Sequence, residues 1–475
     1  MSHAIRANYD QNFLLPPSLE EWLSEDHPSR YIREFVEGLD LKELGFKISI
    51  TEEGRPYFGP DLLLKVWLYG YFNKFRSSRQ LEKQCKESIA LIWLTGMNYP
   101  DHNTIWRFWK ENKGSIKKLF KESVSIALKL ELVGMVLQAL DGTKIKSYSS
   151  KRGALKKSRI LEMEKLIDES IEEMEKKVEE NEEIEEGEYK LPEEIQDKKK
   201  LKEKIKGMLK EFEEARRENL NFKETDARII KERDGYCLGY NAQAVVDAKH
   251  GILVGADVLN EENDERSLVP MIEKVKETTE LIPELTLTDS GYATSEQIYR
   301  AEEKGYKVLL NITNKTNIST GSRGEEPYHS SNFKYDEEKD VMICPESKEL
   351  KYKKTQLSKN KRYEVREYKC ENYKDCSVRW ECSKSKAGRR VKLNPYYKSI
   401  KNQQEYQQIE SNKEKLRKRK AMIEPVFGII KEAHGFRRFT VKGLQNVKAQ
   451  WSLMCTTINL KRMYGLWAKG KIKLA

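Results

Sequence analysis

The sequence predicts an α/β protein in which a mixed sheet is flanked by helices and preceded by an all-α region. The first observation is a pair of short apolar runs, at 133–140 and 285–288, each followed directly by an aspartate and soon by a glycine. This pattern is typical of a short buried strand, with Asp141 at its centre or its end and Asp289 where the second strand ends. Second, strand-like and amphipathic helical patterns alternate between residues 225 and 315, as in a sheet with helices on its faces. Third, residues 1–135 show only helical patterns.

Length and composition limit the class of protein. The chain has 475 residues, 38% hydrophobic and 35% charged, and this length predicts roughly three domains. The net charge is +11 and the pI about 8.9, which fits a polyanionic partner, although a solvated lysine-rich surface explains the charge nearly as well. No run of 18 apolar residues and no apolar signal region occur. Seven cysteines argue against a disulfide framework, so we expect a cytoplasmic protein without a membrane partner.

The N-terminal region, 1–135, is expected to form a helical domain of its own. Segments 59–75 and 76–96 read as helices, the second broken near Glu87–Ser88, and a polar-capped helix follows from about residue 101. A helix-turn-helix unit would place the helix at 103–112, with Arg107 and Lys110, in a major groove. The alternative is a small bundle with three tryptophans in its core: Trp93, Trp106 and Trp109.

Two insertions are expected to interrupt the domain at 136–475. Within 155–222, apolar residues recur every three or four positions in two charged stretches, which predicts an antiparallel coiled-coil hairpin. The second insertion, 316–395, is polar, turn-rich and basic, and it contains Cys344, Cys370, Cys376 and Cys382. Their wide spacing is compatible with structural zinc or with reduced thiols in a small irregular module. The basic stretch 351–420 could follow phosphates or be merely solvated.

Between and after the insertions the sequence predicts regular elements. Residues 239–248 and 251–260 read as a strand pair joined by a turn, and a helix, a strand, a helix and a strand follow up to residue 313. Residues 402–435 read as one long helix that contains Glu424 and Pro425, where one backbone hydrogen bond must be lost. A last apolar helix is expected from about Leu444 to Met463.

Three carboxylates stand out as a candidate metal site. Asp141 and Asp289 follow the two apolar runs, and Glu424 lies on the long helix. A buried carboxylate is costly unless a cation or hydrogen bonds meet it, and several carboxylates can hold a pair of Mg²⁺ ions for phosphoryl transfer. For each acid alone a turn or strand exit is the simpler explanation, so the hypothesis rests on all three converging.

The motifs around these acids resemble those of the DDE transposases of prokaryotic insertion elements. The resemblance covers most of the chain: GPDLLLKVWLYGYFNKFRSSRQLEKQC, LDGTKI, GYNAQAVVDAKHGILVGADV, TDSGY, IEPVFGIIKEAHGFRRFTVKG and INLKR. It implies an RNase H-like core in which Asp141, Asp289 and Glu424 are catalytic and bind two Mg²⁺ ions, which Mn²⁺ can replace. It also implies that the protein cuts double-stranded DNA at the terminal inverted repeats of an element and joins the ends to target DNA, as a homodimer on DNA.

Further DNA contacts are expected from basic residues near Glu424. Lys431 would bind a phosphate, with a plain surface lysine as the alternative, and Arg437 and Arg438 would hold the DNA backbone. Related families place a tyrosine seven and an arginine four residues before the glutamate, where this chain has Arg417 and Lys420. Lys420 can contact phosphate as a point charge. The alternative to an active enzyme is an inactive or domesticated DNA-binding protein that regulates its element.

Overall fold

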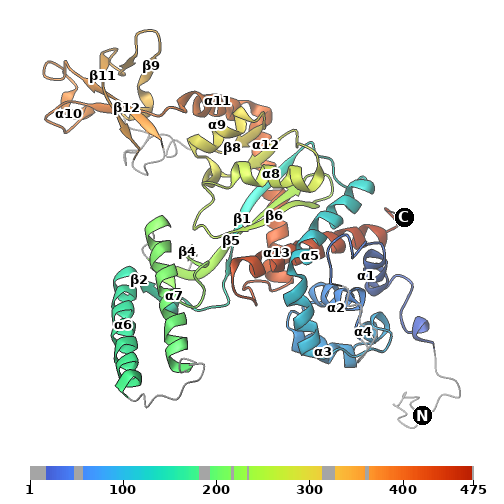
Figure 1. The fold of residues 1–475 in the computed structure, drawn as a ribbon. Helices are drawn as coiled ribbons and strands as arrows, with labels where there is room; N and C mark the ends of the chain where they lie inside the picture. Colours follow the sequence, from blue (N-terminus) through green and yellow to red (C-terminus); the bar gives the residue numbers. More distant parts are fainter. Residues whose placement is uncertain are drawn as a thin grey trace, which may run out of the picture. The chain divides into compact units, whose positions relative to one another are not determined.

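The computed structural model describes residues 18–47, 57–180, 193–215, 219–232, 235–312, 327–358 and 363–472. The chain divides into two compact units, one formed by residues 1–126 and 452–475 and the other by residues 127–451. Figure 1 shows helices and sheets along the whole chain, so the expected α/β class is confirmed. None of the described helices is long and apolar enough to cross a membrane.

The first unit is helical. It contains the 3₁₀ turn η1 (Leu19–Trp22), α1 (Pro28–Glu37), α2 (Pro60–Phe72), α3 (Ser78–Glu87), α4 (Ile89–Leu94) and most of α5 (His102–Lys129). The expected break falls at Ser88, which ends α3 and begins α4. The helix expected at 103–112 instead continues to Lys129, with non-helical backbone angles at Asn112. Residues 452–467 of α13 (Leu444–Trp467) belong to this unit, where Asn459 donates a hydrogen bond to Ser123.

A six-stranded sheet is the centre of the second unit. Its strands are β1 (Gln138–Lys146), β4 (Arg228–Glu232), β5 (Gly235–Asp247), β6 (Leu253–Leu259), β7 (Thr286–Thr288) and β8 (Val308–Leu310). Their order is β4-β5-β1-β7-β8, and β6 also pairs with β5. The β5 strand runs antiparallel to β1, β4 and β6, whereas β7 is parallel to β1 and β8 is parallel to β7. The expected strand pair after the first insertion is therefore confirmed as β5 and β6.

Helices cover the two faces of this sheet. On one face, α8 (Leu268–Thr279) lies so close to β6 that a Cβ on Gly255 would meet Val275 at 2.8 Å. On the other face, Leu287 and Leu309 pack against Leu416 and Met422 of α12 (Glu410–Gly428). The remaining elements near the sheet are α9 (Ser295–Glu303), α11 (Tyr397–Gln408) and the π-helical turn η6 (Ile429–Ala433). The expected single helix over 402–435 is wrong, because the extended backbone of Ile409 separates α11 from α12.

The first insertion contains two helices, α6 (Lys157–Glu180) and α7 (Glu193–Ala215), which Figure 1 shows side by side. Ile160 of α6 packs with Ile205, Met208 and Phe212 of α7. At their base, β2 (Ala154–Lys156) pairs antiparallel with β3 (Asn219–Asn221). The connection at 181–192 lies outside the described residues, and a true coiled coil stays a prediction.

The second insertion is not the irregular module that its composition suggests. It forms a second sheet, with strands in the order β13-β12-β11-β10-β9 and antiparallel throughout. The strands are β9 (Lys334–Asp336), β10 (Val341–Ile343), β11 (Glu349–Leu357), β12 (Glu364–Cys370) and β13 (Arg390–Leu393), with the short helix α10 (Arg379–Cys382). The hydrophobic pattern of the sequence does not predict these strands, because most residues of β11 are exposed.

Candidate active site

Asp141 and Asp289 lie at the same level of two neighbouring strands. In the parallel pair of β1 and β7, Gln138 stands opposite Thr286 and Ala139 opposite Leu287. A hydrogen bond of 2.8 Å from Gln138 Nε2 to Thr286 Oγ1 ties the two strands together. Asp141 lies three residues after Gln138, and Asp289 lies three residues after Thr286. Both aspartates are on the face of the sheet where Leu287 packs against α12. The strand register therefore brings the two acids together, although 148 positions separate Gln138 from Thr286 as they separate the acids.

Asp141 is half-buried, and the charges around it act on its carboxylate in opposite directions. Its Oδ1 accepts a 2.8 Å hydrogen bond from the backbone N–H of Gly142, and its Oδ2 accepts one of 2.9 Å from Arg419 Nη1 on α12. Burial raises the pKa of Asp141, and the negative charge of Asp289 adds to the rise, while Arg419 opposes it. A carboxylate in this position gains from any further positive charge, which is what a metal ion would supply.

Asp289 stands where β7 ends. Its side chain accepts a hydrogen bond from the backbone N–H of Gly291 at 2.8 Å and so caps the 3₁₀ turn η3 (Ser290–Tyr292). This bond uses Oδ1. The second carboxylate oxygen receives no hydrogen bond within the described residues. It can therefore serve as a ligand.

Glu424 lies on α12, the helix that packs over β1 and β7. Its neighbours Ile423 and Val426 are buried, whereas Glu424 itself is exposed. Within the described chain it has no hydrogen bond or ion pair. The structure thus brings Asp141 and Asp289 together and places the helix of Glu424 above them.

Oxygen ligands are the donor set that Mg²⁺ prefers, and the two aspartates fit that chemistry. Among the described residues, however, no three His, Cys, Asp or Glu side chains form a group that could hold a metal ion. The convergence of all three acids on metal therefore remains a prediction.

The basic residues expected to contact DNA lie on α12 and just after it. Lys420 is exposed, and Lys431 is half-buried in the π-helical turn. Arg437 and Arg438 are exposed, Arg437 in an ion pair with Glu432. The backbone beside them is fixed, since Lys146 N–H donates to Arg437 C=O at 3.1 Å and Phe439 N–H donates to Lys146 C=O at 2.9 Å. These two arginines are thereby anchored at the end of the strand that carries Asp141.

In the helical unit, Arg107 and Lys110 both lie on the exposed side of α5, as a groove-binding helix requires. Trp106 shares this side and is 43% exposed, so it is not the core residue that the bundle alternative assumed. Trp93 and Trp109 are buried as that alternative expected. The structure leaves both readings of this region open.

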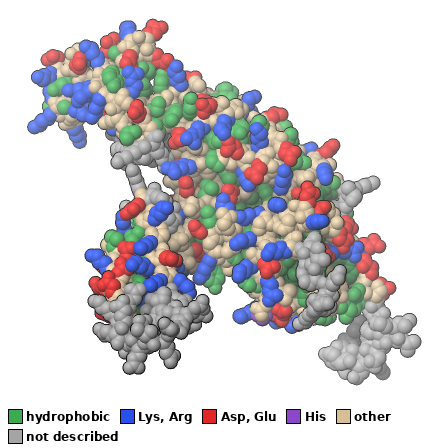
Figure 2. All heavy atoms as spheres, in the orientation of Figure 1, with side chains coloured by type: hydrophobic (Ala, Val, Ile, Leu, Met, Phe, Trp, Pro, Cys, Tyr) green, Lys and Arg blue, Asp and Glu red, His purple; other side chains and the backbone are tan. Residues whose placement is uncertain are grey.

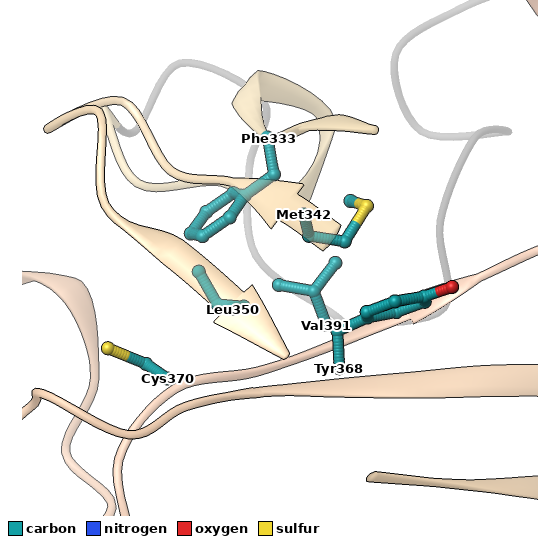
Figure 3. Close-up of a cluster of buried hydrophobic side chains, with 6 residues drawn as sticks. All are labelled: Phe333, Met342, Leu350, Tyr368, Cys370 and Val391. Carbon is teal, nitrogen blue, oxygen red and sulfur yellow. The ribbon is translucent and has the colours of Figure 1, made fainter. Parts of the chain in front are cut away.

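The four cysteines of the second insertion gather near one end of the five-stranded sheet. Cys370 belongs to the buried cluster of Figure 3, against which Cys344 and Cys382 also pack. Burial raises the pKa of Cys370 and of Cys382, and the charges of neighbouring cysteines add to both rises. All four thiols are free, and no three of them form a metal-holding group in the described structure. Structural zinc thus stays a prediction.

Arg419 is the residue of this site that sequence reasoning missed. The sequence interpretation compared Arg417 and Lys420 with a family pattern, yet the side chain between them meets Asp141, across 278 positions of chain. Arg419 is buried, at 8% exposure. A basic residue in helical step with the apolar Ile423 and Val426 was the available signal.

Comparison with protein families gives two matches. Residues 343–464 match the family described as Transposase DDE domain, and residues 17–111 match the one described as Transposase domain (DUF772). The first match includes Glu424 and the second includes Arg107 and Lys110, whereas Asp141 and Asp289 lie outside both. Comparison with curated proteins gave no match.

Both matched families are transposase families. More narrowly, they support a DDE transposase of the insertion-element type, and they confirm the resemblance that the sequence motifs carry.

Proposed function

We propose that this transposase cuts DNA at the ends of its element and joins those ends to target DNA in a divalent-metal-dependent reaction. The observation that carries the proposal is the pairing of β1 with β7, which sets Asp141 and Asp289 side by side. Strand order and directions within β6, β5, β1, β7 and β8 support an RNase H-like core over residues 136–475, interrupted at 155–222 and 316–395.

Asp141, Asp289 and Glu424 are the residues that would hold the two Mg²⁺ ions. Bound there, the ions would supply an activated nucleophile and charge stabilisation at phosphorus. Arg419 orients the carboxylate of Asp141 through a 2.9 Å hydrogen bond, and its charge favours the ionised form. The half-buried position of Asp141, at 19% side-chain exposure, limits its access to water. Low access to water would strengthen the effect of ions held there on the charge that develops at phosphorus.

DNA would be held by basic side chains in both units. Arg437, Arg438 and Lys420 are exposed near the acids, and Arg107 and Lys110 are exposed on α5. Figure 2 shows Lys and Arg intermixed with Asp and Glu on the face that it presents, so phosphate contacts on this face would be local. Handling two ends at once favours a homodimer on DNA.

The test is Mg²⁺-dependent nicking and joining of duplexes made from the sequences that flank the coding region. We expect nicked and then joined products from the wild type and neither from Asp141→Asn. Asp257→Asn is the control within the same sheet, because the carboxylate of Asp257 already pairs with Lys448. Nicking without joining would point to a nuclease and contradict strand transfer.

The second candidate is a DNA-binding regulator that does not cut. The Arg419 guanidinium favours it, because a cation of the chain already neutralises Asp141. Specific binding of the flanking duplexes without nicking in Mg²⁺ or Mn²⁺ would support this candidate and refute the enzyme.

A further inference from the structure

The glycines of the two acidic motifs both face a fourth carboxylate, Asp264. A Cβ on Gly142 would lie 2.5 Å from Asp264 Oδ1, too close for any side chain. A Cβ on Gly291 would lie 3.0 Å from Asp289 Oδ1 and 3.6 Å from Asp264 Oδ2. Asp264 therefore occupies the space that Gly142 leaves open, and its Oδ2 and Asp289 Oδ1 both lie beside Gly291, within 3.6 Å of the place where a Cβ of that residue would be.

Asp264 is held in this position by buried amides. Asn241 Nδ2 donates to its Oδ1 at 2.7 Å and Gln243 Nε2 at 2.6 Å, while the Tyr292 hydroxyl donates to Gln243 Oε1. Asn241, Gln243 and Tyr292 are fully buried. Within the described residues all side-chain hydrogen bonds to Asp264 end on Oδ1, so Oδ2 is available to a ligand.

A second observation points to a ligand at the same place. The Oδ1 atom of Asn241 is buried and has no hydrogen-bond partner among the described residues. It points toward Gly142, whose Cβ would lie 2.9 Å away. Buried polar atoms are almost always satisfied, and an amide oxygen beside carboxylate oxygens is a donor for a hard cation or its bound water.

We propose that Asp264 is a further acid of the cation site and that its Oδ2 shares a divalent ion with Asp289, directly or through a bound water. The inference rests on the proposed function, because it assigns one more ligand to the same site. The amides of Asn241 and Gln243 orient the carboxylate in the way that outer hydrogen bonds orient metal ligands.

The test measures Mn²⁺ binding to the full chain from the electron paramagnetic resonance signal of free Mn²⁺. Asp264→Asn keeps an oxygen for both amide donors and removes the charge. We expect its dissociation constant for Mn²⁺ to rise about tenfold or more. Glu262→Gln is the matched control, since this exposed acid lies in the same loop, and its affinity should equal that of the wild type.

Two results would overturn the inference and are distinguishable. Wild-type affinity in Asp264→Asn, together with weakened binding in Asp289→Asn, removes Asp264 from the site and leaves the proposed function intact. Absence of Mn²⁺ binding and of nicking in the wild type overturns both. Unchanged amide hydrogen exchange in β1 and β7 shows that a loss of affinity in Asp264→Asn does not come from unfolding.

Discussion

Two aspartates, one in or beside each of the two larger sheets of the described chain, have opposite surroundings. Asp340, beside β10, accepts hydrogen bonds of 2.7 Å from the hydroxyls of Tyr368 and Tyr335, and it pairs with Arg366. These hydrogen bonds, that from Tyr368 first, hold the pKa of Asp340 below its ordinary value. Asp141 also has an arginine partner, but burial and the charge of Asp289 raise its pKa.

The difference separates a structural acid from a functional one. Asp340 has all the partners that it needs, so its charge stabilises the sheet around it. Asp141 is half-buried near the like charge of Asp289, an arrangement that costs stability. Such arrangements are typical of functional sites. The same substitution of an acid or of its arginine partner is therefore expected to have different effects at Asp141 and at Asp340.

The largest effect is expected on DNA cleavage when an acid is neutralised in each sheet. Asp289→Asn should lower the initial rate of Mg²⁺-dependent nicking by about a thousandfold, because an electrostatic contribution of this size is typical of a preorganised charge. Asp340→Asn should leave the rate unchanged. Equal rates in the two variants would contradict the distinction.

The next effect is on stability, where the two arginine partners are compared. Arg419→Ala leaves Asp141 buried without its partner and should cost about 3 kcal/mol. Arg366→Ala removes a pair in which both side chains are more than 40% exposed, and it should cost below about 1 kcal/mol. Amide hydrogen exchange of β1 and β12 peptides measures both. In the double variant Asp141→Asn/Arg419→Ala the cost should be less than additive.

The contributions of Asp340 and Asp141 to stability should depend on pH with opposite signs. The pKa of Asp340 is lowered on folding, so its contribution to stability is present above about pH 4 and is lost as the pH falls through its folded pKa. The pKa of Asp141 is raised, so its contribution is present below about pH 4 and is lost as the pH rises through its folded pKa. Exchange protection of β11 and β12, corrected for intrinsic rates, should therefore fall on acidification, and Asp340→Asn should abolish this fall.

The smallest effect on cleavage is expected from the cysteines. If the sequence expectation of zinc holds, purified protein contains zinc that Cys376→Ser removes, while nicking stays near the wild-type rate. Metal content by mass spectrometry is the measurement, with Cys85→Ser in the helical unit as control. A zinc-free wild type with reduced thiols would establish the alternative.

Much of the fold around the site is visible in the sequence because it depends on local pattern. The runs before Asp141 and Asp289 are apolar and short, and both lead into strands: β7 ends directly before Asp289, whereas β1 begins at Gln138 and continues through Asp141 to Lys146. The strand β11 was missed because its lysines leave it mostly exposed. Ile409 gave no signal of the break between α11 and α12, because an isoleucine in a helical pattern carries no stop signal.

The contacts within the site depend on strand register and helix packing, which no local pattern encodes. Arg419 reaches Asp141 across 278 positions, and Asp264 meets two glycines from distant motifs. Asp264 follows β6 in a charged loop without an apolar run. Its role becomes visible only once β5 has aligned Asn241 and Gln243 beside β1.

The convergence of three distant acids can be measured by loading the full chain, bound to a flanking duplex, with Fe²⁺. Hydroxyl radicals generated at the ion cut nearby backbone, and mass spectrometry locates the cuts. The account predicts cuts near Asp141, Asp289 and Glu424, all suppressed by excess Mg²⁺ and by Asp141→Asn. Cuts near the two aspartates with none along α12 would contradict it.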